Sequence, residues 1–476
     1  MIKRLFALLL CLALVPGAGA VNLPDLGDVA SSDLSPLAER QLGESAMREI
    51  RWHDPAYLDD PEVEGYLNRL GRRLVAASGE ADRPFEFFAI DDHTLNAFAL
   101  PGGYIGVHTG LILAAESESE LASVLGHEIA HVSQRHIAQL FGKQSQAGMV
   151  ALASILVAIL AARSNSQLSE AALAAGQAGA IQAQLGYTRA FEREADRIGL
   201  QALEKGGFDV RGMPSFFERL QRSTRLYENN APGYLRTHPL TVERIADMEN
   251  RVAQMRYRQV VDSPDFGFVR AKLRAAAGAA PEAVREFEAA VAESKADVAG
   301  RYGLGRALLR AGRLEEARST VDALRAEAEP SPFIDTLAAE VRLALRDAAG
   351  AIGILETALE RFPEYVSLRY TLIDAMLQAG RAGDAAALAR ASLLRDNRDA
   401  RLWALSSRAE GAAGRLSAHH RAQAEVYVLR GSLPAAIEQL ELARRANDGD
   451  FFDMSAIDAR MRALKAEEQA QRRERR

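Results

Sequence analysis

The first half of the chain has a pattern of apolar positions that is typical of helices interrupted by a small sheet. Apolar residues recur at helical spacing over residues 42–79 and again over residues 117–136. Between these stretches, residues 85–90 and 104–108 have strand composition, and Pro101 with the glycine pair that follows forces a turn before the second strand. We therefore expect an α+β domain over residues 46–260.

The second half of the chain repeats itself with a period of 34 residues. One register is kept by Gly278, Gly312 and Gly380, each with an alanine five residues later. A second register is kept by Phe268, Tyr302 and Tyr370. This period, with its helix-turn-helix punctuation, is the signature of tetratricopeptide repeats, in which neighbouring helix pairs stack into a solenoid. Arg346 stands where the period would place another glycine.

The repeats predict the organisation of the second half. We expect a tetratricopeptide array over residues 264–450, with the turn at Gly431 opening a last helix pair that acts as a cap. Residues 451–476 are expected to form a charged C-terminal helix or tail. The concave face of such an array can bind extended peptides or partner proteins, and the alternative is a purely structural role. The whole chain is predicted to be mainly α.

The N-terminus has the three parts of a cleavable signal peptide. Two basic residues precede an apolar run that is followed by small residues, which places the signal peptide at residues 1–20 and predicts export. An uncleaved anchor is the alternative, but the run is short for a bilayer. Residues 21–45 are rich in Pro, Gly, Ser and Asp and are expected to form an extended leader. Because Cys11 is the only cysteine, the mature chain has no thiolate for a disulfide or a metal.

The charge of the mature chain argues against nucleic acid as a partner. Without Lys3 and Arg4, 56 basic residues stand against 64 acidic ones, a formal charge of −8. The tail at 471–476 is the basic exception. It is interpreted as a solvated helix end, with an anionic partner or peripheral association with a lipid surface as the alternative.

A pair of histidines in residues 126–131 predicts a metal site. On a helix, His127 and His131 are separated by about 400° of rotation and about 6 Å of rise, so both imidazoles leave the same face. Glu128 lies beside them, where its carboxylate can act on a water at the metal without being a ligand. The alternative is a surface helix that carries two histidines by chance.

The acidic segment 191–199 offers the remaining carboxylates. Glu192 and Asp196 are four residues apart, so one helix face can supply a zinc ligand and a carboxylate that orients a histidine ring. Two histidines, one glutamate and a water would form an open catalytic zinc site with one ion per chain. The alternative is a charged helix whose acids pair with Arg193 and Arg197.

Two other histidines differ in what they can contribute. His136 lies five residues after His131, which on a continuing helix points its ring away from the other two, so we do not expect it to bind the metal. His238 precedes a proline in a loop between helices. If that loop faces the zinc, His238 either stabilises the oxyanion or occupies the position of the water and holds the enzyme inactive; otherwise it is simply exposed.

The strand before the histidine helix is the candidate substrate site. A strand beside a zinc helix can offer its free edge to an extended peptide, which then adds as another strand. The residues expected to bind substrate in this way are Asn96, Gly102, Gly103, Tyr104 and Ile105. The alternative is a plain hairpin.

An uncharged segment separates the two predicted metal-binding helices. As a helix, residues 147–162 would be about 24 Å long, which is short of a bilayer span. We expect a buried or lid helix, followed over residues 171–186 by a mobile cover, rather than contact with a membrane.

Together these motifs resemble the HtpX and CAAX-prenyl-protease type of zinc metallopeptidase. The resemblance rests on His-Glu-Ile-Ala-His at 127–131, Glu-Arg-Glu-Ala-Asp at 192–196, Asn-Ala-Phe-Ala-Leu-Pro-Gly-Gly at 96–103, and Thr-His-Pro-Leu-Thr-Val-Glu-Arg-Ile at 237–245. With the signal peptide and the repeats, it narrows to the BepA-like periplasmic members of this type. It implies a gluzincin-like domain followed by an α-solenoid.

The resemblance also implies roles for individual residues. It makes His127, His131 and Glu192 zinc ligands, Glu128 the catalytic base, and Asp196 the residue that supports a ligand. His238 would be a switch that can cap the zinc.

The resemblance further implies quality control of outer-membrane proteins, with the repeats contacting their assembly machinery and unfolded substrates. We therefore expect an exported zinc endopeptidase with possible chaperone-like activity. The alternatives are an assembly chaperone or scaffold whose protease site is mostly latent, and an integral membrane protease.

Overall fold

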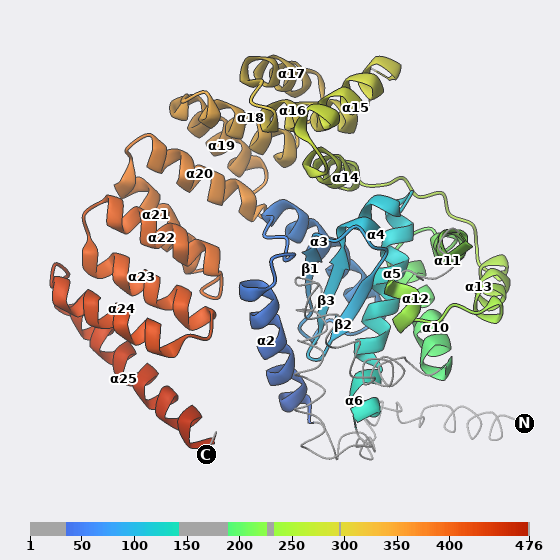
Figure 1. Ribbon diagram of the computed structural model, residues 1–476, viewed down its shortest axis with the longest axis horizontal. Helices are drawn as coiled ribbons and strands as arrows, with labels where there is room; N and C mark the ends of the chain where they lie inside the picture. The colour runs from blue at the N-terminus through green and yellow to red at the C-terminus, as the bar shows by residue number, and fades with distance from the viewer. Residues whose placement is uncertain (1–34, 142–188, 226–232, 295–296, 475–476) are drawn as a thin grey trace, which may run out of the picture.

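The computed structural model describes residues 35–141, 189–225, 233–294 and 297–474. The predicted signal peptide, most of the predicted leader, and the segments 147–162 and 171–186 lie outside these residues. Figure 1 shows two connected parts, a three-stranded sheet surrounded by helices and a curved array of helix pairs, as the sequence predicts. None of the described helices is long and apolar enough to span a membrane.

The first part carries the sheet and the helices around it. Its strands are β1 Glu86–Ile90, β2 Ala97–Leu100 and β3 Tyr104–His108. Its helices are α2 Pro36–His53, α3 Pro61–Ser78, α4 Thr109–Ala114, α5 Glu118–Ser133, α6 His136–Phe141, α10 Arg189–Lys205, α11 Gly212–Arg225, α12 Gly233–Thr237 and α13 Val242–Gln254.

Helix α2 corrects the prediction of an extended leader over residues 21–45, because it begins at Pro36. The Ser35 side chain accepts a hydrogen bond of 3.2 Å from the Ala38 N–H, and Pro36 takes the first helical position, where a missing N–H has no cost. Gly43 then packs directly on the turn before β3, since a Cβ there would lie 1.8 Å from the Pro101 carbonyl oxygen. The Ser-Pro start signal therefore outweighs the leader-like composition of residues 36–45.

The sheet has the order β1-β3-β2, with β1 parallel and β2 antiparallel to β3. In this register Tyr104 pairs with Glu86 on one side and with Leu100 on the other. Strand β3 therefore has no free edge, and the prediction that Tyr104 and Ile105 receive a substrate strand is wrong in that form. Among the described strands, the edge next to α5 belongs to β2, because the crossover connection puts β3 in the centre.

The second part is an array of antiparallel helix pairs. Its helices are α14 Pro264–Ala276, α15 Ala280–Glu293, α16 Val298–Arg310, α17 Leu314–Glu327, α18 Pro332–Ala344, α19 Ala348–Arg361, α20 Val366–Gln378, α21 Ala382–Leu393, α22 Ala400–Ala412, α23 Leu416–Leu429, α24 Leu433–Ala446 and α25 Phe451–Glu474. The last helix, α25, packs its apolar side on α24. The predicted domain boundary at residue 450 therefore separates two helices that pack against each other.

The 34-residue period marks the turns inside successive pairs. The backbone is left-handed, with positive φ, at Gly278, Gly312, Arg346, Gly380 and Gly414. Arg346 adopts φ of 65° in the place where its neighbours are glycine. The alanine five positions after each of the first four turns is buried. The predicted repeat register is therefore present in the structure.

The array packs against the first part through α2 and α3. The Lys272 ammonium lies 2.6 Å from the Asp60 carboxylate and 2.5 Å from that of Glu62, in a buried cluster between α14 and the start of α3. At the other end, the Arg430 guanidinium stacks over the Trp52 ring at 4.2 Å. One face of the array is thus partly covered by the chain's own N-terminal helices.

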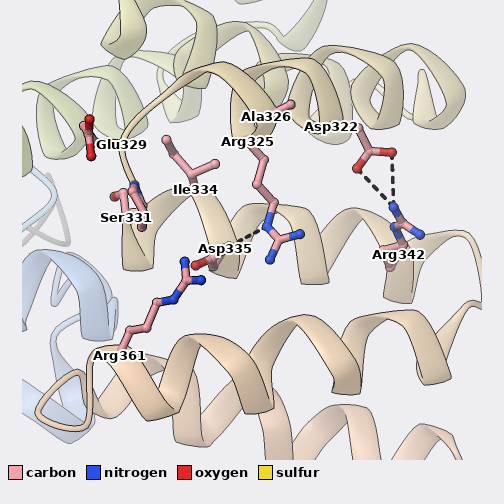
Figure 2. A pocket seen from close by; sticks show the side chains of 10 residues that line it. Asp322, Arg325, Ala326, Glu329, Ser331, Ile334, Asp335, Arg342 and Arg361 are labelled. Carbon is pink, nitrogen blue, oxygen red and sulfur yellow. Dashed lines mark hydrogen bonds and ion pairs between the residues drawn. The ribbon is translucent and has the colours of Figure 1, made fainter.

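A cavity of about 320 Å³ lies within the array between α17, α18 and α19 (Figure 2). Its charged lining is largely paired: Arg325 Nε is 2.6 Å from Asp335 Oδ1, and Arg342 Nη2 is 3.1 Å from both carboxylate oxygens of Asp322. Both pairs join α17 to α18, so the cavity is a space between stacked helices of the array.

Candidate metal centre

Two glycines allow the helices of the site to approach each other closely. Helices α5 and α10 cross where Gly126 faces Gly199, and a Cβ on Gly199 would lie 2.9 Å from the backbone nitrogen of His127. Gly199 lies seven residues after Glu192, on the same helix face as that glutamate and Asp196. The close crossing therefore brings the acidic face of α10 against the histidine face of α5.

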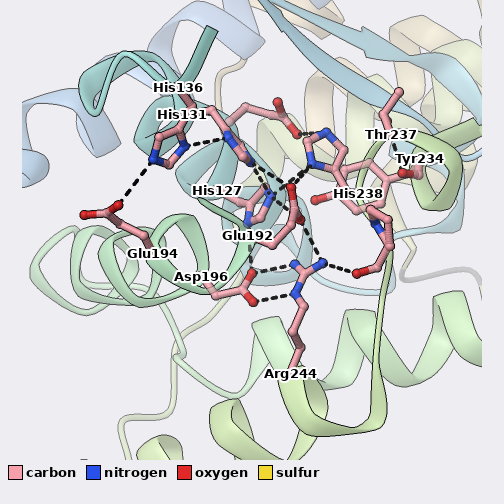
Figure 3. A network of polar contacts seen from close by, with 12 residues as sticks. His127, His131, His136, Glu192, Glu194, Asp196, Tyr234, Thr237, His238 and Arg244 are labelled. Atoms are coloured by element: carbon pink, nitrogen blue, oxygen red, sulfur yellow. Dashed lines mark hydrogen bonds and ion pairs between the residues drawn. The ribbon is translucent and has the colours of Figure 1, made fainter. Parts of the chain in front are cut away.

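Four buried side chains converge at this crossing and form a group that can hold a metal ion. His127, His131, Glu192 and His238 each offer one ligand atom, and these atoms all lie within 4.8 Å of one another. Figure 3 shows the three imidazoles and the Glu192 carboxylate pointing toward a common centre.

The spacing of these atoms fits a tetrahedral ion. His127 Nε2 is 3.0 Å from His131 Nε2 and 3.3 Å from His238 Nδ1, and Glu192 Oε1 is 3.1 Å from His238 Nδ1 and 3.4 Å from His131 Nε2. Metal–ligand bonds of about 2.05 Å in tetrahedral geometry separate ligand atoms by about 3.3 Å. Nitrogen and carboxylate ligands without a thiolate suit zinc.

Asp196 and Glu192, both on α10, have different roles. Asp196 Oδ1 lies 2.9 Å from His127 Nδ1, the ring nitrogen that faces away from the ligand group, so this carboxylate orients the ring. Glu192 instead contributes to the ligand group itself. The predicted alternative, in which both acids form pairs along their own helix, is not what the structure shows, because their partners come from α5 and from residues 238–244.

Arg244 holds both acidic residues and was not identified from the sequence. Its Nε and Nη2 each lie 2.7 Å from an oxygen of Asp196, and its Nη1 lies 2.8 Å from Glu192 Oε2 and from the Pro239 carbonyl oxygen. The guanidinium is almost fully buried. The available signals were its place in the motif at 237–245 and in the first turn of the helix after the His-Pro loop, capped by the Thr241 side chain.

His238 is buried inside the site. The predicted alternative of an exposed His238 is therefore wrong. The ring stacks on Tyr234 with centroids 4.6 Å apart, and its Nε2 lies 3.4 Å from Glu128 Oε1. One edge of the imidazole therefore faces the ligand group and the other faces the predicted base.

Burial and charge shift the pKa values of the site in opposite directions. Burial raises the pKa of Glu128 above its ordinary value, against the pull of His238 and His127. Burial would also raise the pKa of Glu192, but the surrounding histidines, His238 first, hold it well below its usual range. Burial lowers the pKa of His131. These shifts favour an ionised Glu192 and a neutral His131, which are the forms that bind a cation. Burial would lower the pKa of His127, but Asp196 and Glu192 raise it to about 9, so this ring must lose a proton when a cation binds.

The predicted substrate residues serve other contacts. Asn96 is buried, with Nδ2 3.4 Å from His108 Nε2. Gly102 and Gly103 have φ of 80° and 95°, and the missing Cβ atoms leave room for the backbone of Arg40 and Pro84. These glycines form the turn against α2. They are not part of the group of metal ligands.

A buried group of histidines and one glutamate on two crossed helices, with a second glutamate beside it and a helical repeat array attached, defines a metallopeptidase joined to a protein-interaction module. Comparison with known proteins agrees with this class. Residues 61–252 match the model of peptidase family M48, and residues 274–341 and 342–409 match a tetratricopeptide repeat model.

Individual relatives narrow the class of protein further. The chain is 34% identical to the beta-barrel assembly-enhancing protease of Escherichia coli (strain K12) over 449 residues, which cover 94% of this chain and 92% of that protein. It is 41% identical over 263 residues to a putative protein of the same name from Vibrio cholerae, covering 55% and 54%. It is 29% identical over 245 residues to the mitochondrial metalloendopeptidase OMA1 of Schizosaccharomyces pombe, covering 50% and 69%. The chain belongs to peptidase family M48, in the group of the beta-barrel assembly-enhancing proteases.

Proposed function

We propose that this chain is a periplasmic zinc endopeptidase that removes stalled or misfolded outer-membrane proteins during β-barrel assembly. The observation that carries the proposal is the group of four buried ligand atoms, from His127, His131, Glu192 and His238, with Glu128 directly beside it. The similarity of almost the whole chain to the beta-barrel assembly-enhancing protease of Escherichia coli supports the assignment to β-barrel assembly. The array would bind the assembly machinery and unfolded substrates.

The residues around the centre divide the chemistry among them. His127, His131 and Glu192 would hold one zinc ion, which supplies a Lewis acid for the peptide carbonyl and lowers the pKa of water. Glu128 would take the proton of the attacking water and pass it to the leaving amine, a task that its raised pKa suits. Strand β2 lies at an edge of the sheet and next to α5, and an extended peptide would pair with this strand.

His238 supports a second proposal about the resting state. Because its Nδ1 belongs to the ligand group and its Nε2 faces Glu128, the ring occupies space that an attacking water needs. We infer that the site rests in a closed form and opens when the loop carrying His238 moves. A chaperone or scaffold role that does not require cleavage fits this closed form, and is the second candidate function.

The base is tested by Glu128→Gln. Loss of a general base is expected to reduce cleavage of a denatured outer-membrane protein at least about 100-fold, while zinc content measured by atomic absorption stays at the wild-type level. Glu243→Gln, an exposed change in α13, is the control and should cleave normally. Undiminished cleavage by Glu128→Gln would refute the assignment.

The resting state is tested by His238→Ala. If the ring holds the site closed, the variant should cleave the same substrate faster than the wild type at equal zinc content. A slower variant would contradict the closed form and would favour a role for His238 in stabilising the oxyanion.

A further inference from the structure

The histidine ligand His131 is in contact with another histidine, His136. The two Nδ1 atoms are 2.9 Å apart, and the rings meet edge to face with an interplanar angle of 73°. His136 has no exposed surface. Its position is visible in Figure 3, on the side of His131 opposite the ligand group.

A break in the helix puts His136 there. Helix α5 ends at Ser133, Arg135 takes a left-handed φ of 53°, and α6 begins at His136. On a continuing helix a residue five positions after His131 would point about 140° away from it. The left-handed residue interrupts the helix and changes the direction of the His136 side chain, so that its imidazole reaches the outer nitrogen of His131. The sequence prediction that His136 does not bind the metal is compatible with the structure, but its contact with His131 was missed.

The positions of the nitrogens determine which atoms donate. With Nε2 of His131 bound to a metal, its Nδ1 would carry the proton and donate a hydrogen bond to Nδ1 of His136. The remaining Nε2–H of His136 then points at Glu194 Oε2, 3.4 Å away. The His136 ring also stacks on Phe191, with centroids 4.3 Å apart and an interplanar angle of 12°. Glu194, His136 and His131 thus form one line of contacts that ends at the ligand group.

The other histidine ligand is supported differently. His127 Nδ1 faces a carboxylate, that of Asp196, which Arg244 fixes in place. His131 faces an imidazole instead, and the carboxylate of Glu194 lies one step further out. Orienting partners of this kind typically change metal affinity by about 10- to 100-fold when they are removed.

We propose that His136 is a positioning residue for the metal centre, which accepts the Nδ1 proton of His131 and thereby fixes the ring with Nε2 toward the metal. The inference rests on the proposed zinc site. It deepens that proposal by assigning to each histidine ligand its own orienting partner, Asp196 for His127 and His136 for His131.

Two substitutions separate the hydrogen bond from the packing of the ring. His136→Phe keeps a ring on Phe191 but removes the acceptor, whereas His136→Asn removes the ring but keeps an oxygen near the place of Nδ1. In the full-length chain, competition with a chromophoric chelator should show zinc binding weakened about 10- to 100-fold in His136→Phe. His136→Asn should recover most of this loss, although it packs less well. The visible absorption bands of the Co²⁺-substituted protein should shift in the Phe variant and return in the Asn variant.

The opposite order would overturn the proposal, because a packing role predicts that Asn binds zinc more weakly than Phe. Equal affinity of wild type and His136→Phe would also overturn it. If His136→Phe does not fold, Glu194→Ala is the second variant, since that side chain is 40% exposed and lies at the outer end of the line. It should weaken zinc binding in the same direction but by less, and unchanged binding would count against the proposal. Failure of the wild type to bind zinc would instead refute the proposed function.

Discussion

The metal centre and the repeat array are both buried between helices, but they bury different kinds of side chains. The centre collects polar groups from residues 127–136, 192–196 and 238–244, each with a particular partner. The array buries alanines and aromatic rings that recur every 34 residues and contact mainly the next helices. Each polar contact in the centre joins buried groups that need a partner of opposite character, whereas an apolar contact in the array is one of several similar ones. Single substitutions should therefore affect the two regions very differently.

Removal of Arg244 is the strongest way to test this contrast. Arg244→Met leaves Asp196 and Glu192 buried without their cation, and breaking a buried ion pair costs about 3–5 kcal/mol in free energy of unfolding. We expect a cooperative loss of that size in denaturant unfolding of the zinc-free chain. The same change should weaken zinc binding, because Asp196 no longer has a fixed orientation.

A control for this prediction lies on the same helix. Arg251 pairs with Asp247 at 2.9 Å, but both side chains are about 40% exposed. Arg251→Met should cost no more than about 1 kcal/mol, since exposed pairs contribute little. Equal losses of unfolding free energy in the two variants would show that the buried ion pairs of Arg244 contribute no more to stability than an exposed pair.

The site illustrates what the sequence could and could not predict. The spacing of His127 with His131, and of Glu192 with Asp196, is local and follows from helix geometry, so these residues could be grouped in advance. Arg244 and His136 could not. Arg244 finds its partners only when α13 packs on α10, and His136 reaches His131 only because the left-handed Arg135 interrupts the helix. The order of the strands is equally non-local, which is why β3 was mistaken for an edge.

A smaller effect is expected where α5 and α10 cross. Gly199→Ala places a methyl group 2.9 Å from the backbone of Gly126 and His127, and neither helix can yield without moving ligand residues. We expect a loss of about 1–3 kcal/mol in free energy of unfolding, together with weaker zinc binding in chelator competition.

The matched substitution in the array should have the opposite sign. Gly353 is exposed within α19, and a Cβ there meets nothing within 4 Å. Gly353→Ala should stabilise the chain by about 0.5–1 kcal/mol, because alanine loses less backbone entropy than glycine in a helix. If both substitutions destabilised the chain, the close crossing of α5 and α10 would not be what distinguishes Gly199.

The smallest predicted effect concerns the turn in which the array departs from its own repeat. Arg346 holds a left-handed backbone that costs a non-glycine residue about 1 kcal/mol, and glycine occupies the equivalent position in the preceding and following repeats. The greater conformational entropy of glycine in the unfolded chain offsets most of this cost. Arg346→Gly should therefore raise the midpoint of denaturant unfolding slightly, and Gly312→Arg should lower it by a similar amount. Zinc affinity should not change in either variant, because a turn in the array shares no contact with the ligand group. A change in zinc affinity would mean that the array and the metal centre are energetically coupled through α2 and α3. Substitutions in the array would then also affect the metal centre, contrary to the contrast between the two regions.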